Sequence, residues 1–210
     1  MVKVSSVWAD LYERKSSRAL KKQRHLARYV RPWHRSCLEL FSATGQNAEV
    51  FRRLAPEAIC VGVDYDRALC RIARGKGMIA LAADCRALPF KERSFDLIYV
   101  NSFHHIWESA EETMRACLDL LRPGGVLVGV EPYGLVSRIL ADVICSLPDG
   151  VLAALPDGLA KYTRAIKYEC RNEGVRDWYH RFDFGRALSA HGTAARHRDL
   201  FRIYYCIEKR

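Results

Sequence analysis

The sequence predicts an α/β fold in which helices cover both faces of a doubly wound, mostly parallel sheet. The chain has 210 residues, 50% of them hydrophobic and 28% charged, and this length suits one domain with a sizeable core. Short apolar runs alternate with helical patterns through its middle, and the runs are almost continuously apolar, as in strands buried on both faces. With only 13 glycines and 7 prolines, the composition excludes fibrous, low-complexity and disordered proteins.

Five apolar runs define the expected parallel strands. They are residues 36–41, 59–63, 78–83, 95–100 and 126–130. Helix-like segments lie between them, at residues 48–54, 67–74 and 111–121. Because strands that alternate with helices pair in parallel, residues 36–132 form the expected core.

The first 35 residues are expected to form a basic helical lid. Helical periodicity covers residues 5–30, and Trp8 and Tyr12 belong to its apolar stripe. Residues 1–35 carry a net charge of +8, whereas the whole chain carries +10. This basic excess favours either an anionic partner or an ordinary solvated helix face.

Residues 133–175 are expected to form a small helical cap, and residues 176–210 to complete the sheet. Two Leu-Pro-Asp-Gly sequences, at residues 147–150 and 155–158, predict helix-breaking turns in the cap. Two further strand candidates lie at residues 178–184 and 200–207. With the five central runs they make the expected sheet seven-stranded.

The eight cysteines are expected to be reduced core thiols rather than disulfides or metal ligands. No two of them form a CxxC pair, and several lie inside apolar runs. The N-terminus shows no apolar signal segment, and no apolar stretch approaches the ~20 residues of a membrane-spanning helix. A cytoplasmic protein without a metal site is therefore expected.

The clearest ligand-binding pattern follows the first strand. Residues 38–47 read as a strand, a small-residue turn and a helix start, and such a turn lets the backbone approach a ligand. Asp64 stands nineteen residues after Gly45, at the end of the second strand, where a carboxylate accepts both ribose hydroxyls. The pattern predicts a nucleoside ligand. Because Ala43, Gly45 and Ala48 form a degraded dinucleotide pattern, the loop alone leaves NAD open.

Motifs further along the chain narrow the choice. Asp84-Cys85 ends the third run, residues 94–101 form the fourth, and Leu-Arg-Pro-Gly-Gly-Val-Leu at 121–127 precedes the fifth. In this order and spacing, residues 36–132 resemble the class I S-adenosylmethionine-dependent methyltransferases, specifically the small-molecule group that includes the quinone-biosynthesis enzymes. The resemblance implies a Rossmann-like fold, S-adenosyl-L-methionine as cofactor, and in-line transfer of a methyl group to a small acceptor.

The resemblance also implies a cofactor site. Its residues are Glu39, Phe41, Ser42, Ala43, Thr44, Gly45, Asp64, Tyr65, Asp84, Cys85 and Asn101. Glu39 matches the acid near the methionine amino group, and the loop that follows it wraps the methionine end. Asp64 matches the ribose-binding acid, with Tyr65 beside the adenine. Asp84 matches the acid that reaches the adenine amino group.

The remaining two positions of this site match a backbone contact and the reaction centre. Cys85 supplies the backbone contact, and Asn101 lies where donor and acceptor meet. Two loop positions depart from the family pattern, because Phe41 and Ala43 replace its first two glycines. Ala43 is small and is expected to keep the backbone close to the ligand if its φ is negative. The bulk of Phe41 keeps open the alternative of a non-catalytic binding protein with this fold.

Residues expected to contact the acceptor lie outside the cofactor motifs. His104 and His105 follow Asn101 and are the candidate general base, which a hydroxyl acceptor needs; a packing or helix-capping role is the alternative. Trp8 and Tyr12 are assigned to the substrate lid, where they offer π faces to a sulfonium; packing of the helix on the sheet is the alternative, and is favoured for Trp8. The apolar cap favours an apolar or aromatic acceptor.

The sequence after the fourth run argues against nucleic acid as the acceptor. Base-amine methyltransferases carry Asn/Asp-Pro-Pro-aromatic there, whereas residues 101–104 read Asn-Ser-Phe-His. An RNA methyltransferase that uses residues 1–35, the basic arm, to bind phosphates remains an alternative. Peripheral contact of the same arm with an anionic membrane also remains open.

Overall fold

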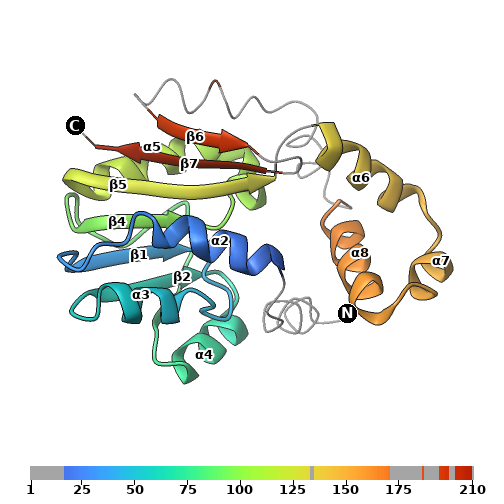
Figure 1. Ribbon diagram of the computed structural model, residues 1–210, viewed down its shortest axis with the longest axis horizontal. Coiled ribbons are helices and arrows are strands. Elements are labelled where there is room, and N and C mark those ends of the chain that lie inside the picture. Colours follow the sequence, from blue (N-terminus) through green and yellow to red (C-terminus); the bar gives the residue numbers. More distant parts are fainter. Residues whose placement is uncertain (1–16, 133–134, 171–185, 187–193, 199–201, 210) are drawn as a thin grey trace.

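A computed structural model describes residues 17–132, 135–170, 186, 194–198 and 202–209. Its strands form one seven-stranded sheet in the order β3-β2-β1-β4-β5-β7-β6 (Figure 1). The strands are β1 Ser36–Leu40, β2 Ile59–Asp64, β3 Ile79–Ala82, β4 Phe95–Val100, β5 Leu121–Pro132, β6 Ala194–Arg198 and β7 Arg202–Glu208. β1 to β5 pair in parallel, and β7 pairs antiparallel with β5 and β6. The predicted fold class is confirmed.

Helices cover the two faces of this sheet. The helices that follow the parallel strands are α3 Ala48–Leu54, α4 Arg67–Gly75 and α5 Ala110–Leu120. Met114 and Cys117 of α5 belong to the same buried cluster as Leu38 on one face. Val50 and Phe51 of α3 pack on the other face, with residues from the N-terminal helix. Burial on both faces explains why the strands read as continuous apolar runs.

The N-terminal helix α2, Ser17–Ala27, lies across the sheet face that α3 also covers (Figure 1). Leu26 is completely buried, and the Nε2 atom of buried His25 lies 3.2 Å from the carbonyl oxygen of Tyr205 in β7. Burial lowers the pKa of His25 to about 4, so its imidazole is neutral at pH 7. Trp8 and Tyr12 lie outside the described residues.

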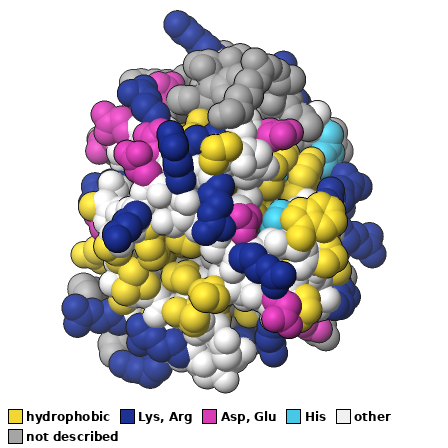
Figure 2. Space-filling view, turned by 90° about the vertical axis from the view of Figure 1, so that its left-hand side faces the viewer, with side chains coloured by type: hydrophobic (Ala, Val, Ile, Leu, Met, Phe, Trp, Pro, Cys, Tyr) yellow, Lys and Arg dark blue, Asp and Glu magenta, His cyan; other side chains and the backbone are white. Residues whose placement is uncertain are grey.

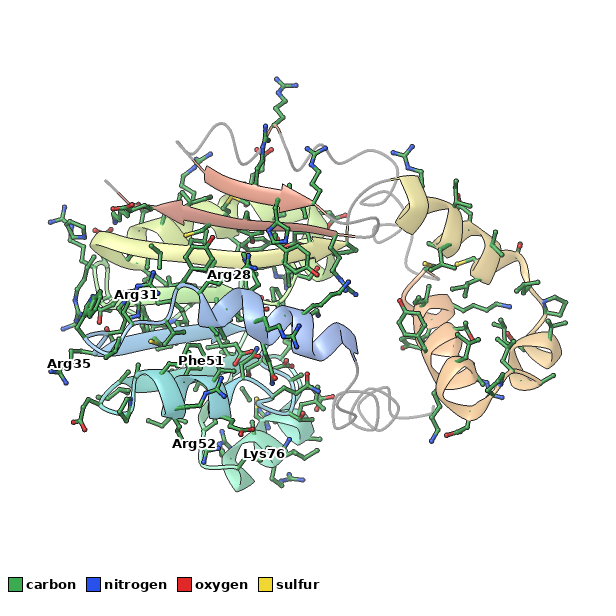
Figure 3. The ribbon with its side chains drawn as sticks, viewed as in Figure 1. Arg28, Arg31, Arg35, Phe51, Arg52 and Lys76 are labelled. Carbon is green, nitrogen blue, oxygen red and sulfur yellow. The ribbon has the colours of Figure 1, made fainter. Side chains whose placement is uncertain are left out.

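The described basic residues of the arm extend from Lys22, which contacts Asn101 just after β4, to Arg35 at the opposite edge of the sheet. Arg35 directly precedes β1, at the amino ends of the parallel strands. Arg28, Arg31 and Arg35 lie progressively closer to that edge (Figure 3). Figure 2 shows this edge, where Lys and Arg side chains are separated by hydrophobic and acidic ones. These arginines therefore lie away from the carboxyl edge, where ligands bind in doubly wound sheets.

Three short helices follow β5 and lie beyond the carboxyl ends of the parallel strands (Figure 1). They are α6 Leu135–Ser146, α7 Asp149–Ala153 and α8 Asp157–Glu169. The two Leu-Pro-Asp-Gly sequences separate them, as predicted, and each proline is the N-cap of the next helix. Lys167 of α8 donates to the carbonyl of Leu147 and pairs with Asp149 at 2.9 Å, which ties α8 to the first of these turns.

Differences from the expected elements concern three strands. β5 begins at Leu121, five residues earlier than predicted, so α5 ends one residue early. The strand expected at 200–207 is β7. The candidate at 178–184 lies outside the described residues, and β6 is the edge strand beside β7. The sequence did not predict β6 because Arg196, His197 and Arg198 give it no apolar alternation; charged side chains are common on edge strands.

Candidate functional site

The loop after β1 has an unusual backbone conformation. Phe41, Ala43 and Gly45 all have positive φ angles, of 55°, 47° and 72°. Ala43 therefore does not meet the condition of a negative φ under which an alanine was expected to suit this loop. A left-handed conformation costs an L-residue about 1–2 kcal/mol, so surrounding contacts must hold Phe41 and Ala43 in it. The loop has the backbone that glycines at these positions would favour.

Backbone hydrogen bonds hold this loop against β2. The N–H of Ser42 donates to the carbonyl of Val63 at 3.1 Å, and the N–H of Gly45 donates to the carbonyl of Ser42 at 2.8 Å. Gly62 permits the close approach, because a Cβ atom there would lie 2.7 Å from Ser42 Oγ. Gly45 lies against Ala73, where a Cβ would be 3.1 Å from the alanine methyl. Contacts outside the loop therefore fix its path.

Asp64, at the carboxyl end of β2, braces the same loop. Its Oδ2 accepts from the N–H of Ala43 at 2.9 Å, and its Oδ1 accepts from the N–H of Asp66 at 2.9 Å. The side chain is almost completely buried, and burial is the main cause of its raised pKa. Each carboxylate oxygen has a second lone pair, so Asp64 retains acceptor capacity for a ribose.

Glu39 is the most deeply buried acid of the loop region. Its Oε1 accepts from Nδ2 of Asn47 at 2.6 Å, and no hydrogen-bond partner of Oε2 lies among the described residues. Desolvation raises the pKa of Glu39 to about 8, against the lowering effects of Asn47 and Lys22. A buried carboxyl with one unsatisfied oxygen suits a cationic or hydrogen-bonding ligand group.

Two loop hydroxyls are also buried without a partner in the described part of the chain. They are Ser42 Oγ and Thr44 Oγ1, on residues that are 2% and 0% exposed. Buried polar atoms are usually hydrogen-bonded. With Glu39 Oε2 they place three unsatisfied polar atoms within six residues, and a ligand with polar groups fits such a loop.

The residues expected around an adenine follow β2 and β3. Tyr65 is 82% exposed, and Cys85 is buried. Asp84 forms a fork with Arg86, with Nη2 to Oδ2 at 2.6 Å and Nε to Oδ1 at 3.0 Å. Hydrogen bonds from Arg86 lower the pKa of Asp84, which is therefore ionised at pH 7. The carboxylate that was expected to meet an adenine amino group thus has a guanidinium beside it.

Asn101 lies at the carboxyl end of β4, where α2 reaches it. Its Oδ1 accepts from Nζ of Lys22 at 2.6 Å. Next to Lys22, Nε2 of Gln23 donates to the carbonyl of Gln46 at 2.9 Å. The N-terminal helix thus contacts both the β1–α3 loop and the end of β4, a contact that the sequence did not reveal.

Glu131 is a second residue that the sequence reasoning missed. It stands one residue before the end of β5, is completely buried, and accepts from Ser102 Oγ at 2.7 Å and from the N–H of Phe103 at 2.9 Å. Ser102 has a φ of 97°. Glu131 therefore fixes the segment that follows Asn101. An acid at the end of an apolar run was the available signal.

His104 and His105 lie in η1, Phe103–Ser109, directly after this segment. The structure does not describe the side chains of these two residues, so the candidate base stays a prediction.

In the described part of the chain, no three His, Cys, Asp or Glu residues are grouped as metal ligands. No described helix is long and apolar enough to cross a membrane. The eight cysteines are free, and six of them are buried.

Comparisons with known proteins bear on the same segment. A family model described as a methyltransferase domain matches residues 38–129. Malonyl-[acyl-carrier protein] O-methyltransferase 1 of Coxiella burnetii is 37% identical over 86 residues, which are 41% of this chain and 28% of that protein. Demethylmenaquinone methyltransferase of Thermus thermophilus is 29% identical over 129 residues, 55% of this chain and 59% of that one. The chain thus spans less than two thirds of either relative.

Solved structures share the fold over nearly the whole chain. The PH0226 protein from Pyrococcus horikoshii OT3 has a TM-score of 0.65 at 14% identity, covering 95% of this chain and 93% of that one. The plantazolicin methyltransferase BpumL in complex with SAH has a TM-score of 0.60 at 13% identity, covering 98% and 90%. At such identities these likenesses concern the fold.

Proposed function

Because residues 38–129 are a class I S-adenosylmethionine-dependent methyltransferase domain, we propose that the chain transfers a methyl group from this donor to a small acceptor. The observation that carries the proposal is the loop of Phe41, Ala43 and Gly45. Two of its residues adopt a conformation that is unfavourable for them. A strained backbone kept in place by its surroundings is typical of a functional site. The conformation also weakens the case for a non-catalytic protein, which was based on Phe41.

The polar groups of the site fit the parts of the donor. Glu39 and the loop from Ser42 to Gly45 hold the amino-acid end, where three buried polar atoms lack partners among the described residues. Asp64 holds the ribose hydroxyls. Tyr65, Asp84 and the backbone of Cys85 surround the adenine, and Asp84 shares its carboxylate between Arg86 and the adenine amino group.

When bound, the donor supplies a methyl group on a positively charged sulfur. The task of the chain is to align this group with the acceptor and to exclude water, and alignment alone contributes about 7–11 kcal/mol to such reactions. Asn101 lies at the end of β4, where donor and acceptor meet, and Glu131 fixes the following segment. His104 or His105 accepts the proton of a hydroxyl acceptor.

The acceptor is proposed to be small and apolar or aromatic. The relatives are named as methyltransferases of malonyl-[acyl-carrier protein] and of demethylmenaquinone. Ile139 and Val143 are exposed on one side of α6 and offer apolar surface beyond the carboxyl edge. We assign residues 133–175 to the acceptor region, 1–35 to a lid that includes Trp8 and Tyr12, 36–132 to the donor-binding core, and 176–210 to the closing strands.

Calorimetric titration with S-adenosylhomocysteine tests the proposal. We expect saturable binding by the wild type and at least a ~10-fold loss for Asp64→Ala, because hydrogen bonds to a charged group contribute about 1.5–3 kcal/mol each. Asp66→Ala is the matched control. It removes the cap of α4, where Asp66 accepts from the N–H groups of Ala68 and Leu69, and it keeps the backbone N–H that donates to Asp64. Absence of binding, or equal binding by wild type and Asp64→Ala, would refute the proposal.

A further inference from the structure

Lys22 brings a positive charge from the N-terminal arm to the proposed donor site. Its Nζ donates to Asn101 Oδ1 at 2.6 Å, across 79 positions of the sequence. Two neighbours on the same helix, α2, hold it in place. Gln23 donates to the carbonyl of Gln46, and Leu26, in the last turn of α2, is completely buried. The half-buried Lys22 is therefore held at the carboxyl edge of the sheet.

Glu39 brings a buried carboxyl group to the same place. It stands one residue before the end of β1 and is paired in register with Tyr99, two residues before Asn101. Lys22 is close enough to lower the pKa of Glu39. An ammonium and a buried carboxyl with one unsatisfied oxygen thus face the region of the β1–α3 loop.

We propose that Lys22 binds the carboxylate of the methyl donor's amino-acid end while Glu39 binds its ammonium group. This inference rests on the proposed function and adds to it a residue outside the matched domain. The amino-acid end of the donor carries one charge of each sign. Lys22 is complementary to its carboxylate, and the ammonium of the ligand favours the ionised form of Glu39. The ammonium of Lys22 has three N–H donors, so it serves a carboxylate while it keeps Asn101.

Among the described residues of the arm, other basic side chains are less suited to this role. Arg28, Arg31 and Arg35 lie toward the amino edge of the sheet (Figure 3). Lys21 is exposed, whereas Lys22 is half-buried. One charge of the basic arm therefore belongs to the donor site.

The test compares two ligands that differ only in the carboxylate: S-adenosylhomocysteine and its decarboxylated analogue, which keeps the amino group. The full chain is titrated calorimetrically with each. We expect Lys22→Met to weaken S-adenosylhomocysteine about 10- to 100-fold, the range for one charge-assisted hydrogen bond. Its affinity for the analogue should equal that of the wild type. Lys22→Arg should restore most of the loss, and Lys21→Met, with the same loss of charge, should bind like the wild type.

The outcomes separate this inference from the proposed function. Equal weakening of both ligands by Lys22→Met means that Lys22 acts through Glu39 or through the fold, and overturns the inference. Unchanged binding of S-adenosylhomocysteine by Lys22→Met overturns it too, while a wild type that binds this ligand still supports the proposed function. A wild type that binds neither ligand overturns both. Circular dichroism of each variant checks that the fold is intact.

Discussion

Removal of the buried carboxylate of Glu131 should strongly destabilise the fold. Glu131→Ala leaves the hydroxyl of Ser102 and the N–H of Phe103 without their acceptor, on residues that are 4% and 0% exposed. A buried group without a partner costs about 1–3 kcal/mol, which gives about 2–6 kcal/mol for the two. We therefore expect Glu131→Ala to lower the free energy of unfolding by about 2–6 kcal/mol.

Urea denaturation followed by circular dichroism measures this change, and two variants grade it. Glu131→Gln keeps the shape and one acceptor oxygen, and should lose about 1–2 kcal/mol. Ser102→Ala removes one donor and leaves Glu131 bound to Phe103, so it should lose about 1 kcal/mol. The reasoning is refuted if Glu131→Ala loses less than about 1 kcal/mol, or if Ser102→Ala loses as much as Glu131→Ala.

Two further predictions concern the loop and its buried acid. Gly62→Ala places a Cβ 2.7 Å from Ser42 Oγ and should lower the free energy of unfolding by about 1–3 kcal/mol. Ser42→Gly in the same chain should recover part of it in urea denaturation, and strictly additive effects would contradict the contact. Glu39 has its pKa raised to about 8 from 4.5, so the folded chain holds a proton that the unfolded chain releases between these values. Stability should therefore fall as pH rises from 4.5 to about 8. Thermal unfolding at about pH 5 and pH 8 measures this fall, and it should be smaller in Glu39→Gln than in the wild type. An equal fall in the two proteins would contradict the raised pKa of Glu39.

The sequence predicted the central strands because burial on both faces leaves a local signal. Each of β1 to β4 is a short apolar run that can be recognised without its neighbours. β6 has no such signal, since it lies at an edge and its described side chains are exposed. An edge strand forms because a partner such as β7 offers free backbone groups, which local sequence does not encode.

The candidate site could be predicted where position along a strand determines it. Glu39 and Asp64 lie at the ends of adjacent parallel strands, so the spacing alone brings them to one edge. The positive φ of Ala43 could not be predicted, because local preference disfavours the left-handed region, whereas the hydrogen bond from its N–H to Asp64 favours the observed path. Lys22 and Glu131 were missed since their partners lie 79 and 28 or more positions away.

One measurement tests the central claim that the β1–α3 loop binds the adenosyl group of a methyl donor. The wild-type chain is titrated calorimetrically with S-adenosylhomocysteine and, in parallel, with NADH, the ligand class that the loop sequence alone left open. We expect saturable binding of S-adenosylhomocysteine with one ligand per chain and no binding of NADH. Binding of NADH without binding of S-adenosylhomocysteine would contradict the account.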